Sequence, residues 1–118
     1  MTETLDWRPA VFDHRDSAPE VFRVGPCVVH RRTRTVESPG GKQRLRAKEL
    51  ELLLHLYEHV TTTFSREELL QRVWNCAPDL LTRTVDQTMA TLRKKIESNP
   101  ERPQFLQTVY GIGYRLVL

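Results

Sequence analysis

The stretch that most constrains this fold is residues 82–97, which read TRTVDQTMATLRKKIE. Its apolar side chains recur at spacings of four, three and four, which is the repeat of one helical face: Val85, Met89, Leu92 and Ile96. The opposite face carries no carboxylate and is made of Arg83, Gln87, Ala90, Thr91 and Lys94, flanked by Arg93 and Lys95. Such donors match base edges and phosphate oxygens, so the pattern favours a helix in a DNA groove. A solvated surface helix is the alternative for this segment taken alone.

The charge of the chain is unevenly distributed along its 118 residues. Residues 1–20 hold five acidic and two basic residues, whereas the remainder holds ten acidic and 16 basic residues. We interpret residues 1–20 as an acidic tail or linker and residues 21–118 as one domain. A basic domain indicates a polyanionic partner.

No membrane-length apolar run or secretory signal is visible, so we expect a cytoplasmic protein with no membrane partner. The two cysteines, Cys27 and Cys76, are expected to be free thiols.

Short β-rich runs and turn residues in the first third of the domain predict a small antiparallel sheet of four strands. The predicted elements, in chain order, are strands at 21–24, 27–30, 33–37 and 42–46, a helix at 47–60, a strand fragment at 61–64, helices at 66–75 and 82–97, and a hairpin of 105–109 with 114–118. The fold class is therefore α+β, with an N-terminal four-stranded sheet, three helices and a C-terminal hairpin.

Local signals fix several of these boundaries. Ser65 and Glu68 have the spacing of a capping box, and Thr82 is the expected N-cap of the helix at residues 82–97.

In the first helix, the apolar spacing directs His55 and His59 toward solvent. Two histidines at this spacing can bind a metal, but no third ligand lies nearby in the sequence. We therefore expect no metal and no cofactor.

Two helices joined by a loop and closed by a hairpin have the layout of a winged helix-turn-helix, in which the second helix of the pair lies in the major groove. At this point the chain resembles the DNA-binding effector domain of OmpR/PhoB-type response regulators, which belong to bacterial two-component systems. The resemblance spans residues 21–118 and rests on five blocks in order: Ala47–Leu53, Ser65–Leu70 with Val73 and Trp74, Arg83–Asp86, Leu92–Glu97 and Thr108–Leu116.

The resemblance implies roles for particular residues. Positions implied to face DNA are Arg83, Gln87, Thr88 and Thr91, and positions implied to contact backbone or minor groove are Trp74, Arg93, Lys94, Thr108 and Tyr110. The loop 75–81 corresponds to a segment that touches RNA polymerase in relatives, and a second copy on DNA is a further implied partner.

Three departures from the family pattern alter these expectations. Thr91 stands where relatives often have a basic residue, Tyr110 replaces a usual wing arginine, and Arg46–Ala47 replaces Thr-Pro. No receiver domain lies within the 118 residues, so no phosphoacceptor aspartate is assigned. With fewer guanine-directed contacts, we expect the half-site to favour A·T pairs, read by Gln87 and by the Thr91 methyl group.

The leading function is sequence-specific binding of double-stranded DNA for transcription regulation, with a protein-interaction winged helix as the alternative. An enzyme is not expected, because the chain shows no phosphate loop and no local catalytic signature. Purely structural roles are expected for some residues nearby. Trp74 is first a core residue, Ile112 and Tyr114 are expected to pack the hairpin onto the core, and Asp86 is expected to form an ion pair.

Overall fold

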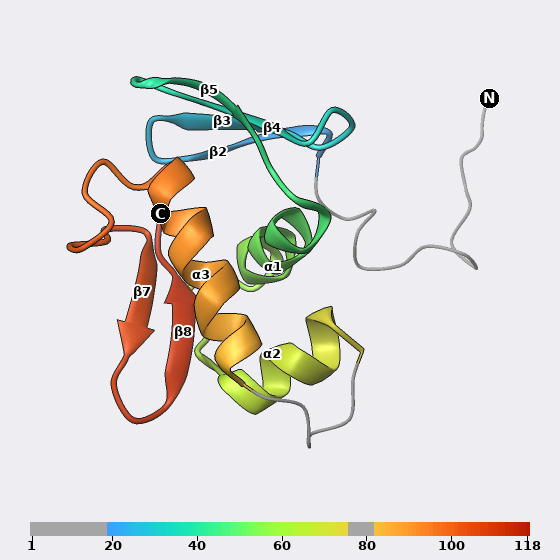
Figure 1. Ribbon diagram of the computed structural model, residues 1–118, viewed down its shortest axis with the longest axis vertical. Coiled ribbons are helices and arrows are strands. Elements are labelled where there is room, and N and C mark those ends of the chain that lie inside the picture. The colour runs from blue at the N-terminus through green and yellow to red at the C-terminus, as the bar shows by residue number, and fades with distance from the viewer. Residues whose placement is uncertain (1–18, 76–81) are drawn as a thin grey trace.

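The structure of the protein is a computed structural model that describes residues 19–75 and 82–118 (Figure 1). The elements follow one another as β2 (Val21–Val24), β3 (Cys27–His30), β4 (Thr35–Ser38), β5 (Gly41–Arg44), α1 (Ala47–Glu58), β6 (Phe64–Ser65), α2 (Arg66–Val73), α3 (Arg83–Ile96), β7 (Leu106–Val109) and β8 (Gly113–Leu116). This order confirms the predicted α+β architecture. The second helix ends at Val73, earlier than expected, because the chain turns there through Trp74 and Asn75.

The N-terminal sheet is an antiparallel meander in the order β2-β3-β4-β5. Its register places Phe22 beside Val29 and Val29 beside Val36. These three side chains are almost completely buried, so they form one apolar row across the inner face of the sheet. Strands β2 and β3 alternate between buried and more exposed residues, as expected for a sheet with one face on the core, whereas every residue of β5 is exposed.

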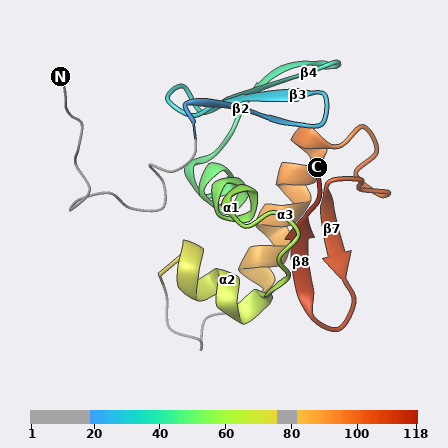
Figure 2. The ribbon, with the colours of Figure 1, turned by 180° about the vertical axis from the view of Figure 1, so that it is seen from behind.

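Helix α1 lies at the centre of the molecule, with the N-terminal sheet on one side and α2 and α3 on the others (Figures 1 and 2). Because neighbours surround it, seven of its twelve residues are buried. The prediction of a solvent-facing His55 is therefore wrong: its side chain is 4% exposed. The His55 ring packs on those of His59 and Phe64, each at 4.7 Å between centroids.

The three helices begin where the capping signals predict, with one difference in side-chain bonding at α3. Ser65 accepts a hydrogen bond from the Glu68 backbone at 3.0 Å and donates its own N–H to the Glu68 carboxylate at 2.8 Å, which confirms the capping box. Helix α1 lacks a hydroxyl cap, as expected, and the Glu49 carboxylate accepts the Arg46 N–H at 2.8 Å. Thr82 is the N-cap residue of α3, as predicted, but it has helical dihedral angles and its side chain makes no capping hydrogen bond.

The C-terminal hairpin pairs with the short strand β6, giving a second sheet in the order β6-β8-β7. Gly113 makes this pairing possible, because a Cβ atom there would lie 1.9 Å from the Phe64 carbonyl oxygen. Gly111, in the turn, has φ +78°, a left-handed conformation that glycine adopts without strain. The hairpin is thereby anchored to the start of α2 and lies alongside α3 (Figures 1 and 2).

Candidate nucleic-acid interface

One side of α3 is core and the other is solvent, as the sequence pattern predicted. Val85, Met89 and Leu92 are fully buried and Ile96 is 3% exposed. The opposite side, which we call the α3 outer face, is exposed along its whole length and consists of Arg83, Gln87, Ala90, Thr91 and Lys94. Thr88, at its edge, is half-buried. The outer face therefore presents cations and polar groups on a rigid helix whose rotation is fixed by its buried side.

The single acidic residue of α3 is neutralised by its neighbours. Asp86 accepts a hydrogen bond from the Arg66 guanidinium of α2 at 2.8 Å and from the Tyr114 hydroxyl of β8 at 2.6 Å. This ion pair agrees with the structural role expected for Asp86. Burial, followed by the bond to Asp86, raises the pKa of Tyr114 to about 12. The contacts join α2, α3 and the hairpin and leave the outer face without an uncompensated negative charge.

Arg93 connects α3 to the hairpin. Its Nε donates to the Leu106 carbonyl at 2.9 Å, its Nη2 donates to the Thr108 hydroxyl at 2.8 Å, and its guanidinium lies 5.5 Å from the centre of the Tyr114 ring. Contact of Arg93 with the DNA backbone stays a prediction. Arg93 and Thr108 bind each other, because the guanidinium lies over β7 and β8, and together they fix the hairpin relative to α3.

The tip of the hairpin is the most exposed apolar part of the described chain. Tyr110 is 92% exposed and Ile112 is 59% exposed, on either side of Gly111. The prediction that Ile112 packs on the core is wrong, since the turn places it beyond the end of the three-stranded sheet. Tyr114 does pack on the core, at 8% exposed. Tyr110 is thus free to reach a partner, as its implied wing role requires.

A hollow of about 410 Å³ lies between the start of α1 and α3. It is lined by Arg46, Ala47, Lys48, Glu49, Trp74, Thr84, Gln87, Thr88 and Thr91. Trp74 is half-buried against the core, as expected, and its remaining surface opens into this hollow. Arg46 and Lys48 were not predicted as site residues, because their position beside α3 depends on how the helices pack.

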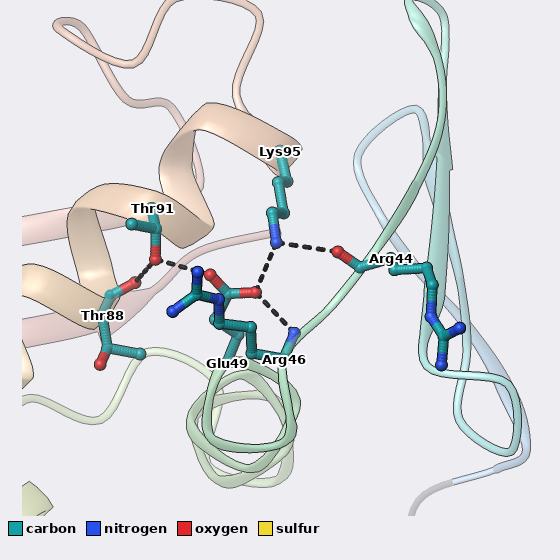
Figure 3. A network of polar contacts seen from close by, with 6 residues as sticks. All are labelled: Arg44, Arg46, Glu49, Thr88, Thr91 and Lys95. Carbon is teal, nitrogen blue, oxygen red and sulfur yellow. Dashed lines mark hydrogen bonds and ion pairs between the residues drawn. The ribbon is translucent and has the colours of Figure 1, made fainter.

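A buried carboxylate lies behind the α3 outer face (Figure 3). Glu49 of α1 is 2% exposed and accepts hydrogen bonds from Thr91 Oγ1 at 2.6 Å, Lys95 Nζ at 2.7 Å and the Arg46 N–H at 2.8 Å. Burial raises the pKa of Glu49, but these bonds outweigh it, so the pKa lies below its ordinary value. Lys95, which flanks the outer face, also donates to the Arg44 carbonyl at 2.8 Å, so its ammonium group is held by α1 and the end of β5.

A second buried carboxylate organises the loop between α3 and the hairpin. Glu97, 6% exposed, accepts the backbone N–H groups of Gln104 at 2.7 Å, Phe105 at 2.9 Å and Leu106 at 2.7 Å. These bonds set the point at which β7 begins.

The Cys27 thiol lies nearby and donates to the Ile96 carbonyl at 3.2 Å. Burial, and then the charge of Glu97, raise the pKa of the Cys27 thiol.

Some predictions concern residues that lie outside the described part of the chain. Residues 1–18 of the acidic tail, Cys76 and residues 76–81 of the proposed polymerase-contacting loop lie outside them. Within residues 19–75 and 82–118, no group of three His, Cys, Asp or Glu side chains has the arrangement of a metal site. No helix in that part of the chain has the length and apolar content to cross a membrane.

Comparison with known proteins now decides the family. Residues 40–116 match the family model described as the C-terminal domain of transcriptional regulatory proteins. The match covers α1, α2, α3 and the hairpin, the same elements that build the candidate interface. The chain belongs to this family.

Curated relatives of this effector domain are longer regulators. The probable transcriptional regulator ycf27 of Cyanophora paradoxa is 36% identical over 97 residues, which are 80% of this chain and 41% of that protein. PhoP of Bacillus subtilis, an alkaline phosphatase synthesis regulator, is 43% identical over 72 residues, which are 61% of this chain and 30% of PhoP. The chain thus spans less than half the length of these relatives.

Solved structures show the same effector-domain fold. DrrB of Thermotoga maritima, an OmpR/PhoB homologue, superposes with a TM-score of 0.73 at 31% identity, covering 86% of this chain and 46% of DrrB. The RstA DNA-binding domain of Klebsiella pneumoniae, solved with the RstA box, gives 0.70 at 25% identity, covering 84% of this chain and 98% of that one. The predicted winged helix-turn-helix and the OmpR/PhoB resemblance are both confirmed.

Proposed function

We propose that this chain binds double-stranded DNA sequence-specifically, with α3 in the major groove and the β7–β8 hairpin on the adjacent backbone or minor groove. The observation that carries the proposal is the α3 outer face: an exposed helical surface with no carboxylate, opposite a fully buried apolar face. A helix with cationic and amide donors on one face matches the dimensions and acceptors of the major groove.

Base readers and phosphate contacts are assigned from exposure and chemistry. Gln87 is exposed at the middle of the outer face, where its amide can pair with an adenine edge in two places. Arg83 and Lys94 are exposed toward its two ends and suit phosphate oxygens. Thr88, at the edge of the face, and Trp74, beside it, are assigned supporting contacts.

The hairpin supplies the second contact. Arg93 and Thr108 hold it against α3, so helix and wing meet DNA as one unit. Tyr110 is assigned the contact with the backbone or minor groove, because it is almost fully exposed at the tip. Similar structures support DNA as the partner, since the RstA DNA-binding domain was solved with its RstA box and the AdeR DNA-binding domain with an intercistronic region.

The proposal extends to the organisation of the chain. We take residues 21–118 as the DNA-binding domain, residues 1–20 as an acidic tail or linker, and the cytoplasm as its location. RNA polymerase at residues 75–81 and a second copy on DNA remain proposed partners. A catalytic activity forms no part of the proposal, since transcription regulation is the function of the family.

Selection of bound sites from random duplexes, at one fixed salt concentration, tests the proposal. We expect a defined motif with A·T pairs under α3, and Gln87→Ala should relax the preference at one step by about 1–3 kcal/mol. Affinity for the selected site should fall steeply with salt, since each phosphate contact releases counterions. A protein that enriches no motif and binds duplexes without salt dependence would instead fit the protein-interaction alternative.

A further inference from the structure

Thr91 is exposed on the α3 outer face, yet its hydroxyl proton is already used inside the protein. A threonine hydroxyl carries one proton, and the acceptors within reach of it are Glu49 Oε2 at 2.6 Å and the Thr88 carbonyl at 3.0 Å. The shorter bond, to a charged acceptor, is the stronger of the two. Whichever bond holds the proton, Thr91 has no donor left for a base or phosphate.

The same bond fixes how Thr91 faces outward. Its hydroxyl points toward Glu49, and its methyl group points away from the carboxylate (Figure 3). A threonine side chain occupies one of a few staggered rotamers, so fixing the position of the oxygen also fixes that of the methyl group. Thr91 therefore presents carbon rather than a hydrogen-bond donor to whatever lies on the outer face.

Glu49 is itself held firmly enough to act on Thr91. Its other oxygen accepts from Lys95 Nζ at 2.7 Å and from the Arg46 N–H at 2.8 Å, and the side chain is 2% exposed. The Lys95–Glu49 pair stabilises the packing of α1 on α3 whether or not Thr91 takes part. The bond from Thr91 of α3 is an additional contact, and it is made to the second carboxylate oxygen, Oε2.

We propose that Glu49, from its buried position on α1, is a specificity-determining positioning residue that makes Thr91 a reader of the thymine 5-methyl group. The inference rests on the proposed function, because it concerns how that same surface reads DNA. The 5-methyl group is the feature that distinguishes thymine from other bases by apolar contact in the major groove. Glu49 itself touches no DNA.

The direct test removes the thymine methyl group from the DNA. In the selected site, each thymine under α3 is replaced in turn by deoxyuridine, and affinities are measured at fixed salt. Wild type should lose about four-fold in affinity at one step, which is the contribution of burying about one methyl group. Thr91→Ser keeps the hydroxyl for Glu49 but lacks the methyl group, so it should bind both duplexes equally. Thr91→Val keeps an outward methyl group and should retain the four-fold loss.

The role of Glu49 is tested by adding Glu49→Gln to wild type and to Thr91→Val. In wild type, the weaker acceptor should let the Thr91 side chain rotate, and the deoxyuridine penalty should fall to about two-fold. In Thr91→Val the penalty should not change, because valine presents a methyl group in either orientation. If Glu49 had a purely structural role, Glu49→Gln would lower the stability of wild type and of Thr91→Val alike. The deoxyuridine penalty would then stay unchanged in both proteins, and this result would overturn the proposal.

A second measurement keeps the test decisive if Glu49→Gln does not fold. Three-bond couplings to the Thr91 methyl carbon in free wild-type protein should report one rotamer, and averaged couplings would overturn the inference. Failure of the proposed function looks different, because wild type would then enrich no site in the first place. A selected site in which every thymine tolerates deoxyuridine would leave DNA binding intact and refute the reading by Thr91.

Discussion

The buried Glu97 carboxylate, which accepts three backbone N–H groups, is the basis of a prediction about stability. Glutamine has nearly the same shape as glutamate, but one of its terminal groups is a donor. In Glu97→Gln that NH₂ must face at least one backbone N–H that the carboxylate now accepts, with the smallest loss at Gln104. Two donors then oppose each other in a buried site, and each unmatched donor costs about 1–3 kcal/mol.

We therefore expect Glu97→Gln to lower the free energy of unfolding by about 2–6 kcal/mol, which corresponds to a Tm lower by at least roughly 10 °C in a domain of this size. Urea denaturation at 25 °C, followed by circular dichroism, measures the loss. The matched control is Glu101→Gln, which makes the same charge change at an exposed position in the same loop. Equal stability losses in the two variants would refute the argument, because they would show that the backbone hydrogen bonds contribute nothing.

Three further predictions follow from the helix packing and its charges. Arg83→Ala and Lys94→Ala should each weaken DNA binding and reduce the salt slope by about one unit with the fold intact by circular dichroism, because both side chains are exposed on the outer face; unchanged affinity in both would count against the groove assignment. Met89→Ala and Leu92→Ala should each cost about 2–5 kcal/mol in denaturant melts, since both are fully buried, and curves that barely move would mean that the helix is rotated. Because the pKa of Glu49 is lowered by folding, its stabilisation is present above the ordinary glutamate pKa of 4.5 and is lost as pH falls through the folded value. Acid titration of stability should thus be less steep for Glu49→Gln than for wild type, and identical slopes would contradict the lowered pKa.

Several features of this protein were determined by sequence over short distances. The four, three, four spacing of Val85, Met89, Leu92 and Ile96 defined the buried side of α3 and therefore its outer face. The Ser65 and Glu68 pair located the start of α2. Patterns of this kind succeed because a helical face and a capping box each depend on residues within one or two turns.

The tertiary structure decided which polar residues are available to a partner. The periodicity of α1 identifies its most apolar face. It does not show that the sheet, α2 and α3 also cover other faces of this helix, and His55 is therefore buried although the pattern predicts exposure. Arg93 and Lys95 look equally solvent-facing in sequence. Their partners, the Leu106 carbonyl and the Glu49 carboxylate, lie 13 and 46 residues away.

Thr91 shows the same division within a single side chain. Its exposure and its place on the outer face follow from its spacing along α3, which the sequence states directly. The direction of its hydroxyl depends on Glu49, 42 residues earlier on another helix. A local pattern determines which face of an element a residue occupies, whereas the partner of a polar atom is set by whichever distant segment packs there, because hydrogen bonds require contact within about 3 Å.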